Sequence, residues 1–448
     1  MSNAREDEDE ERVRSYVETT LGARVVHCER QPRWRPAWFL DAERAGETLR
    51  LYFRGDRGIS QGGAYELEHE MRCLQGLGRA GIPVPRVYGF CDEPRGILME
   101  RAAGRADLST ALDDTERHAV QDDYMRILAR IHALDTAPFE AAGLSRPPPD
   151  APLALSDFAI WERGFRKSKA RPEPLLEFGI RWLHRNVPKG EGRVRFVCCD
   201  SGQFMFENGR VTALLDLELA HLGDPAEDLA GLRTRDLSEP LGDLRRAIST
   251  YEHVTGQPVD RRLVDYHTIR FALVTPMAIA PMVASPPPGV DLVQYLCWYH
   301  VYSRAPLEVI AHMQGIALEV PSLPEPEPTR HAAAHDALVR ALRPAREADR
   351  FAAYQGDAAL RIAEYLRRAE RYGPALEADD RAEVADLIGR TPRDWRDADS
   401  ALEALVGAVG PERDAELVRH FYRRTLRQEF LLAPVMRELA DAQIQMLD

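Results

Sequence analysis

Residues 196–218 of the chain read Phe196-Val-Cys-Cys-Asp200-Ser-Gly-Gln203-Phe-Met-Phe-Glu-Asn208-Gly209-Arg-Val-Thr-Ala-Leu-Leu-Asp216-Leu-Glu218. An Asn-Gly pair between two apolar runs predicts a β-hairpin, because both central residues of its tight turn need positive φ. Pairing outward from the turn places Ser201 opposite Asp216, so Asp200 and Asp216 should emerge at the same end. Two carboxylates at one strand end are typical of a site that binds a divalent cation and moves a proton. Ordinary surface acids are the alternative, and the local spacing does not decide between them.

Composition narrows the class of protein. The chain has 448 residues, 44% of them hydrophobic and 29% charged, which predicts two or three globular domains. A net charge of −13 argues against a general nucleic-acid or anionic-membrane surface, although a local basic patch could still bind a phosphorylated ligand. Because no window holds eighteen uninterrupted apolar residues, we expect no membrane partner. The six scattered cysteines favour a reduced, cytoplasmic protein, with Cys198 and Cys199 buried in an apolar run.

The N-terminal part of the chain reads as a small α+β lobe over residues 13–103, preceded by a disordered acidic leader over residues 1–12. Strand-like runs separated by turns predict an antiparallel meander. A helix and two further extended segments follow, and prolines force the first of these out of the helical region. The segments expected in this lobe are strands 23–28, 37–41 and 48–54, helix 65–77, extended segment 82–89 and strand 96–100.

Helical spacing dominates the rest of the chain. Residues 104–319 contain long amphipathic patterns around the hairpin of residues 196–218. Residues 320–330 include four prolines in ten positions and predict an extended linker. Residues 331–448 are rich in Ala, Leu, Arg and Glu, which predicts a separate all-α domain. The expected class is therefore α+β, with a small β lobe, a helical lobe and a C-terminal helical domain.

This order of parts resembles the aminoglycoside phosphotransferase-like family, which has a protein-kinase-like fold. It is most similar to the branch found as the kinase-like domain of certain acyl-CoA dehydrogenase fusions, and the resemblance covers about residues 13–315. The segments that carry it are Arg54, His69-Glu70-x-x-x-Leu74, Ile82-Pro-Val-Pro-Arg86, Leu128-Ala-Arg-Ile-His132-Ala-Leu134 and Ala213-Leu-Leu-Asp216-Leu-Glu218-Leu-Ala-His-Leu-Gly-Asp224-Pro-Ala-Glu-Asp228-Leu-Ala230.

The resemblance implies ATP and Mg²⁺ as cofactors and assigns roles to matching residues. Asp200 would accept the proton of the substrate hydroxyl, and Asp216 would bind Mg²⁺. Arg54 takes the place of the family's lysine, where it would pair with Glu70 and the phosphates. Residues 99–103, including Met99 and Arg101, would form the hinge beside adenine. Asp224 and Asp228 are assigned to structural support of the catalytic loop, since Asp224 begins a capping box.

The chain departs from the family in its catalytic loop. The family's His-Gly before the aspartate is Cys198-Cys199 here. An ungapped count places Met205 at the metal-binding asparagine, whereas a loop two residues shorter places Gln203 there. We prefer Gln203 as the metal ligand, because Mg²⁺ takes oxygen donors. The loop Gln31-Pro-Arg-Trp-Arg-Pro36 replaces a glycine-rich phosphate loop; its arginines either reach a phosphate while Trp34 stacks, or form a surface turn.

Two functions from different classes follow. The first is an ATP- and Mg²⁺-dependent phosphotransferase that acts on a small-molecule hydroxyl, such as that of a hydroxyacyl-CoA. The second is a degenerate kinase fold that binds a nucleotide or acyl ligand, with residues 331–448 as a partner-binding or homodimer module. Retention of Asp200 and Asp216 favours the enzyme, while the altered loop and Arg54 favour the binding protein.

Overall fold

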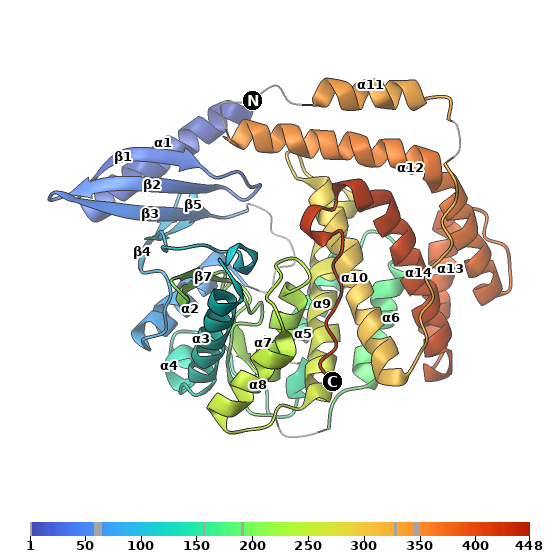
Figure 1. Ribbon diagram of the computed structural model, residues 1–448, viewed down its shortest axis with the longest axis horizontal. Helices are drawn as coiled ribbons and strands as arrows, with labels where there is room; N and C mark the ends of the chain where they lie inside the picture. The colour runs from blue at the N-terminus through green and yellow to red at the C-terminus, as the bar shows by residue number, and fades with distance from the viewer. Residues whose placement is uncertain (1, 58–64, 156, 190–191, 327–328, 344–349) are drawn as a thin grey trace.

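The molecule has two lobes followed by further helices (Figure 1). The computed structural model describes residues 2–57, 65–155, 157–189, 192–326, 329–343 and 350–448, and the side chains of its first helix from residue 8 onward. An antiparallel sheet lies at one end and a larger helical body at the other, so the predicted α+β two-lobe class is confirmed. The N-lobe elements are α1 (Ser2–Leu21), β1 (Arg24–Arg30), β2 (Ala37–Arg44), β3 (Glu47–Gly55), α2 (Leu67–Arg79), β4 (Val87–Asp92) and β5 (Arg95–Glu100).

The N-lobe sheet has the strand order β1-β2-β3-β5-β4, and each neighbouring pair is antiparallel. The predicted order of three strands, one helix and two strands is therefore confirmed. Helix α2 packs against β4 and β5 through Leu67, Leu74 and Leu77, which recur at helical spacing. This packing places Glu70 of α2 against Arg54 at the end of β3.

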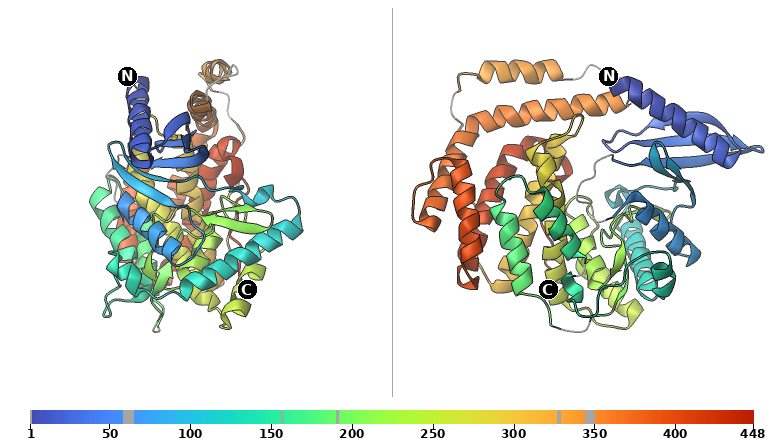
Figure 2. Two further views of the ribbon diagram at one scale, coloured as in Figure 1. Left: turned by 90° about the vertical axis from the view of Figure 1, so that its left-hand side faces the viewer. Right: turned by 180° about the vertical axis from the view of Figure 1, so that it is seen from behind.

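Helix α1 covers all described residues of the leader over residues 1–12 that the sequence predicts to be disordered, so that prediction is wrong for residues 2–12; residue 1 lies outside the described residues. Val13 and Val17 are fully buried and belong to the core on one face of the sheet. The helix crosses this face close to β1 and β4 (Figure 2). Because packing holds these two turns in place, the helix extends outward through pairs such as Arg12 with Glu8, one turn apart at 2.7 Å.

The C-lobe surrounds the hairpin with helices. Strand β6 pairs with β9 and strand β7 pairs with β8, and both pairs are antiparallel. The helices are α3 (Asp114–His132), α4 (Ala137–Ala141), α5 (Phe158–Ser168), α6 (Pro174–Arg185), α7 (Ala226–Arg235), α8 (Leu244–Thr255), α9 (Arg261–Ala284) and α10 (Leu292–Gln314), with short 3-10 turns at Leu108–Thr110 and Leu153–Leu155. The strands are β6 (Arg195–Val197), β7 (Phe204–Glu207), β8 (Arg210–Leu214) and β9 (His221–Gly223).

Helix α9 is, among the described helices, the one whose length and composition would allow it to cross a membrane. However, 72% of its apolar eighteen-residue window is buried inside the protein. It packs against α7 and α10, which supply apolar partners on several sides. A helix that is hydrophobic all round is also typical of a large globular core, and we interpret α9 in that way.

The C-terminal helices share one hydrophobic core with the C-lobe. This core includes residues of α6, α9 and α10 together with residues of α13 and α14, and Phe178 lies 5.7 Å from Phe421 between ring centres. The boundary at residues 320–330 stays a prediction, but the packing is continuous, which a separate domain would not show. The elements are α11 (Ala332–Leu342), α12 (Arg350–Ile388), α13 (Trp395–Ala408) and α14 (Asp414–Leu432), with 3-10 turns at Pro411–Arg413, Ala433–Val435 and Arg437–Leu439.

Helix α12 reaches from the C-terminal helices back to the N-lobe (Figures 1 and 2). At its start, Arg350 forms an ion pair of 3.0 Å with Glu29 of β1. The guanidinium of Arg30 lies 4.5 Å from the ring centre of Phe351. The N-lobe therefore contacts helices from both ends of the sequence. The contacts of α12 with β1 help to hold the N-lobe in position relative to the C-lobe.

Candidate active site

The hairpin of β7 and β8 turns at Asn208 and Gly209, as predicted. Their φ angles are +52° and +74°, the left-handed conformation that this turn requires. Glu207 pairs with Arg210 directly outside the turn and Phe206 pairs with Val211 next, which also agrees with the prediction.

The register farther from the turn differs from the prediction. A bulge shifts the pairing, so that Met205 lies opposite Ala213. The predicted pairing of Ser201 with Asp216 is therefore wrong by one residue, because one extra residue is accommodated in the second strand. Asp200 and Asp216 nevertheless emerge at the same end of the hairpin, and the charge of Asp216 adds to the effect of burial in raising the pKa of Asp200.

Asp200 lies in the loop before β7 and keeps 18% of its side chain exposed. Arg235 at the end of α7 donates to both of its oxygens, through Nη2 and, at 3.2 Å, through Nε. The amide nitrogen of Gln203 donates to Asp200 Oδ2 at 2.9 Å. Burial raises the pKa of Asp200, while Arg235 opposes this shift. In this structure Gln203 therefore bonds to Asp200, and its role as a metal ligand beside Asp216 stays a prediction.

Asp228 holds the loop that carries Asp200. Its carboxylate is fully buried and accepts the backbone N–H groups of Cys198 at 3.0 Å and Cys199 at 2.7 Å. It also lies 2.9 Å from Nε2 of His132 on α3. The prediction that Asp228 supports the catalytic loop structurally is confirmed.

Arg54 joins the two lobes at the centre of the site. Its Nε donates to Glu70 at 2.7 Å, and its Nη2 contacts Asp216 and, at 3.2 Å, Glu218. The structure thus brings together three residues that the sequence singled out, Arg54, Glu70 and Asp216. Arg54 is buried, and its carboxylate neighbours raise its pKa well above the usual value despite the opposing effect of burial.

Glu218 completes this cluster with two further arginines. Arg35 donates to Glu218 Oε2, and Arg57 lies 3.3 Å from Oε1. Burial would raise the pKa of Glu218, but Arg57, Arg35 and Arg54 lower it below its usual range. Three arginines therefore face three carboxylates, and the formal charge of the cluster is zero.

The carboxylates of this cluster fit a magnesium ion by type and spacing. One oxygen from each of Glu70, Asp216 and Glu218 lies within 4.8 Å of the other two. Mg²⁺ prefers hard oxygen donors and is usually held by one or two carboxylates plus phosphates. Asp216 and Glu218 are the half-buried pair and would hold the ion, whereas Glu70 is buried against Arg54.

The sequence left two alternatives for the loop over residues 31–36, a phosphate-binding loop and a surface turn. The loop does not form a simple surface turn. Arg35 is buried and points to Glu218, as the phosphate-side interpretation requires. Trp34 instead packs edge-on against Tyr295 of α10, with 6.1 Å between ring centres. The loop therefore covers the arginine cluster from the N-lobe side and contacts the C-lobe.

The predicted hinge is largely occupied by the sheet. Met99 is buried within β5, and the N–H of Arg101 donates to Arg50 O at 3.0 Å. The Arg101 side chain pairs with Asp41 at 2.9 Å. Their role in adenine binding stays a prediction, and the backbone of Ala102 and Ala103 is the part beyond the strand.

Comparisons with known proteins agree with this arrangement. The model of the phosphotransferase enzyme family (APH) matches residues 32–263, more than half of the chain. The chain belongs to this family. A solved structure of a predicted aminoglycoside phosphotransferase from Ralstonia eutropha aligns with a TM-score of 0.50 and 20% identity, over 67% of this chain and 98% of that one, which supports the fold.

Curated relatives point to the branch suggested by the sequence. Mouse acyl-CoA dehydrogenase family member 10 is 29% identical over 182 residues, covering 37% of this chain and 16% of the relative. Rat acyl-CoA dehydrogenase family member 11 is 28% identical over 184 residues, covering 38% of this chain and 23% of the relative. The chain thus matches less than a quarter of the length of either protein, the part that carries the phosphotransferase-family domain.

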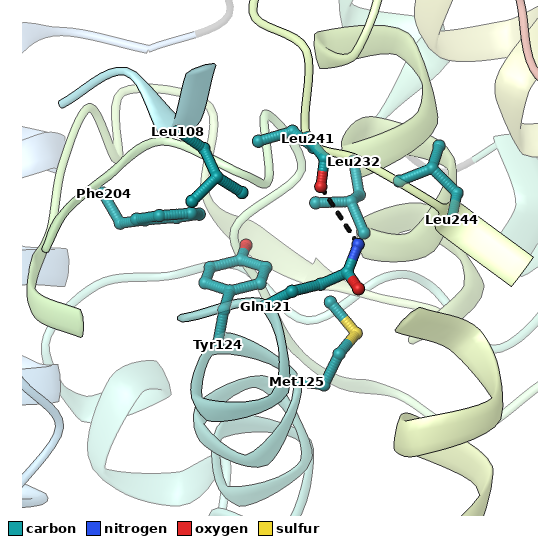
Figure 3. A pocket seen from close by; sticks show the side chains of 8 residues that line it. All are labelled: Leu108, Gln121, Tyr124, Met125, Phe204, Leu232, Leu241 and Leu244. Carbon is teal, nitrogen blue, oxygen red and sulfur yellow. Dashed lines mark hydrogen bonds between the residues drawn. The ribbon is translucent and has the colours of Figure 1, made fainter. Parts of the chain in front are cut away.

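An apolar cavity lies behind the catalytic loop of this phosphotransferase-family chain (Figure 3). Its volume is about 10 Å³, room for a single water at most. Tyr124 on its wall bonds to the N–H of Gly202 at 2.7 Å, and Gln121 donates to Leu241 O at 3.0 Å. The cavity is therefore part of the packing that holds the loop and is too small for a substrate.

The sequence interpretation missed three residues of the site: Arg57, Glu218 and Arg235. Glu218 stands two positions after Asp216, so a second acid close to the residue predicted to bind the metal was an available signal. Arg235 follows Asp228 by seven residues, two helical turns, which places both on the face of α7 that meets the catalytic loop. No signal in the sequence identifies Arg57 as a partner of Glu218.

Gly231→Ala is expected to displace the catalytic loop. A Cβ on Gly231 would lie 1.8 Å from Cys199 O and 3.0 Å from Ser201 N, both backbone atoms. We expect a loss of about 1–3 kcal/mol or more in the free energy of unfolding, measured by urea denaturation. The control is Gly356→Ala in α12, where no atom lies within 4 Å and alanine should stabilise the helix slightly. Equal stability of Gly231→Ala and wild type would contradict the tight packing of α7 on the loop.

Proposed function

We propose that this chain is an ATP- and Mg²⁺-dependent phosphotransferase that acts on the hydroxyl group of a small molecule. One observation carries the proposal: Asp200 and Asp216 emerge at one end of the hairpin, and Arg54 links Asp216 to Glu70 of the N-lobe. Phosphoryl transfer depends mainly on positioning and charge neutralisation. The cluster supplies cations for phosphates and carboxylates for a metal in adjacent positions.

On the nucleotide side, Arg54, Arg35 and Arg57 would bind the phosphates, and Asp216 with Glu218 would hold Mg²⁺. When bound, Mg²⁺ would neutralise phosphate charge as the phosphoryl group is transferred. The pairing within the cluster supports these two roles, because each arginine already contacts a carboxylate. When Mg²⁺ and ATP bind, the arginines would contact phosphates and the carboxylates would contact the metal. Adenine would lie against the backbone of Ala102 and Ala103.

On the acceptor side, Asp200 would accept the hydroxyl proton. Burial raises the pKa of Asp200, which is the direction that a general base acting near neutral pH needs. We favour a hydroxyacyl thioester or a related alcohol as acceptor, supported by the similarity to acyl-CoA dehydrogenase family members 10 and 11. Arg235 would have to share Asp200 with the incoming hydroxyl.

A second candidate is a ligand-binding protein without transferase activity. The observation that favours it is the double contact of Arg235 with Asp200, which occupies both oxygens of the proposed base. In this case the cluster around Arg54 would still bind a nucleotide. The C-terminal helices, on which Leu338 and Leu366 are exposed, would then bind a protein partner or a second copy of the chain. In either case we propose a reduced, cytoplasmic setting, supported by six free cysteines.

Thermal unfolding with ATP plus Mg²⁺, and with ATP alone, tests the nucleotide site. A ligand that binds only the folded state at one hundred times its Kd adds about 2.7 kcal/mol of stability. We expect a higher midpoint with both components than with ATP alone. ADP formation over a panel of hydroxyacyl-CoAs and sugars then separates the two candidates, since the binding protein gives the midpoint shift without ADP. The absence of any shift with any metal would contradict both.

A further inference from the structure

A second cluster of chemically active side chains lies in the C-lobe, beneath the catalytic loop. Cys199 Sγ, one imidazole nitrogen of His221 and one carboxylate oxygen of Asp157 all lie within 4.8 Å of one another. Their exposed fractions are 2%, 5% and 3%, so the cluster is sealed from solvent. Cys199 has a φ of +64°, an uncommon conformation for a non-glycine residue. The backbone is thus held in a costly geometry at the residue that brings its thiol to this cluster.

The ligand atoms of the cluster are oriented by further contacts. Asp157 accepts hydrogen bonds from Tyr65 at 2.6 Å and from Trp161 Nε1 at 2.9 Å. His221 Nδ1 lies 3.0 Å from Leu219 O, which leaves Nε2 directed into the cluster. Metal-binding histidines usually donate their other ring nitrogen to a carbonyl or carboxylate in this way.

Glu227 lies at the edge of the same cluster. Its Oε2 is 3.0 Å from His221 Nε2 and also contacts Arg270 of α9. Glu227 is thus shared between the cluster and the guanidinium of Arg270.

We propose that Asp157, Cys199 and His221 form a structural Zn²⁺ site, with Glu227 as the fourth ligand. A thiolate, an imidazole and carboxylates are the donors that Zn²⁺ takes in tetrahedral protein sites, at about 2.0–2.3 Å. Around such an ion the ligand atoms stand roughly 3.5 Å apart. The spacing of up to 4.8 Å among Asp157, Cys199 and His221 therefore needs a contraction of about 1 Å. Glu227 lies outside this set and would turn from Arg270 to become the fourth ligand. Mg²⁺ is a poor match, because it does not favour thiolates.

The ion would connect three segments that lie far apart in the sequence. Cys199 belongs to the catalytic loop, His221 to β9 and Asp157 to the start of α5. Because Asp200 follows Cys199 directly, the ion would fix one end of the loop, as Asp228 does through the backbone. This site is independent of the proposed phosphotransferase activity, since none of its ligands belongs to the cluster around Arg54.

Titration of the metal-free 448-residue chain with Co²⁺ tests the site. Co²⁺ substitutes for Zn²⁺, and thiolate coordination gives a charge-transfer absorption in the near ultraviolet. We expect this band to saturate at one ion per chain, and Zn²⁺ to abolish it by displacement.

Matched cysteine variants identify the ligand. Cys199→Ala should abolish the absorption band, whereas Cys198→Ala, at an equally buried neighbour outside the cluster, should retain it. Circular dichroism of both variants monitors folding. The proposal is overturned if the wild-type protein gives no thiolate band at stoichiometric Co²⁺, or if a band of equal strength persists in folded Cys199→Ala. The wild-type titration alone is decisive if that variant does not fold.

Discussion

Asp200→Asn is expected to lower the rate of phosphoryl transfer by about 10²- to 10⁴-fold, the usual contribution of a general base. The amide cannot accept the hydroxyl proton, although it has nearly the same shape as the carboxylate. One of its two polar atoms becomes a donor facing the guanidinium of Arg235, so the contact on that side is weakened as well. Nucleotide binding should persist, because Asp200 does not contact Arg54 or Glu218 in the described hydrogen-bond network.

The measurement is ADP formation with the best acceptor of the panel, together with the midpoint shift caused by ATP and Mg²⁺. Asp114→Asn on α3 is a matched control, since it removes an exposed carboxylate that pairs only with Arg117 three residues later among its described contacts. We expect normal turnover from the control and a normal midpoint shift from both variants. Turnover in Asp200→Asn within a factor of ten of wild type would show that Asp200 is not the base.

The pH profile gives an independent check of the same residue. Burial raises the pKa of Asp200 above the ordinary aspartate value, and Asp216 and Glu218 act in the same direction. The base works only when deprotonated, so kcat/KM should fall as the pH is lowered through this raised pKa. An acid limb at or below the ordinary value, near pH 3.9, would contradict the assignment.

Local sequence rules captured the elements that depend on neighbouring residues. The Asn208-Gly209 turn and the alternation of strands in the N-lobe follow from backbone preferences and short-range spacing, and both are present. The contact between Arg54 and Glu70 was predicted from the resemblance. Local sequence rules do not indicate which residue of β3 meets which residue of α2. Asp228 was assigned correctly, since a capping sequence places its helix against the loop.

The remaining features depend on contacts that short-range rules do not contain. The bulge at Met205 changes the register without any glycine or proline to mark it. Helix α1 is held by burial of Val13 and Val17 on a sheet that forms from later residues. Similarly, the shared core between α6 and α14 joins residues more than two hundred positions apart, which helical periodicity cannot indicate.

Asp228→Ala is expected to lower the free energy of unfolding by at least about 3 kcal/mol. It removes one fully buried carboxylate that serves the N–H groups of Cys198 and Cys199 and the ring of His132. Each buried polar group that loses its partner costs about 1–3 kcal/mol. The same change frees the loop on the side of Asp200, so the folded fraction should also transfer phosphate more slowly.

Urea denaturation measures the loss of stability, and Tyr251→Phe is the graded control. Tyr251 bonds to the far nitrogen of His132 at 2.7 Å, so its hydroxyl lies one step farther from the loop. Its removal takes away one hydrogen bond and should cost about 1 kcal/mol. If Asp228 acts by holding the loop, Asp228→Ala must be less stable than Tyr251→Phe. The kcat of Asp228→Ala must also fall by more than the fraction of unfolded protein explains, whereas Tyr251→Phe keeps its kcat. Equal losses of stability in both variants would contradict this. They would mean that the whole chain of hydrogen bonds from Tyr251 through His132 to Asp228, and not the two backbone contacts of Asp228, sets the stability of the site.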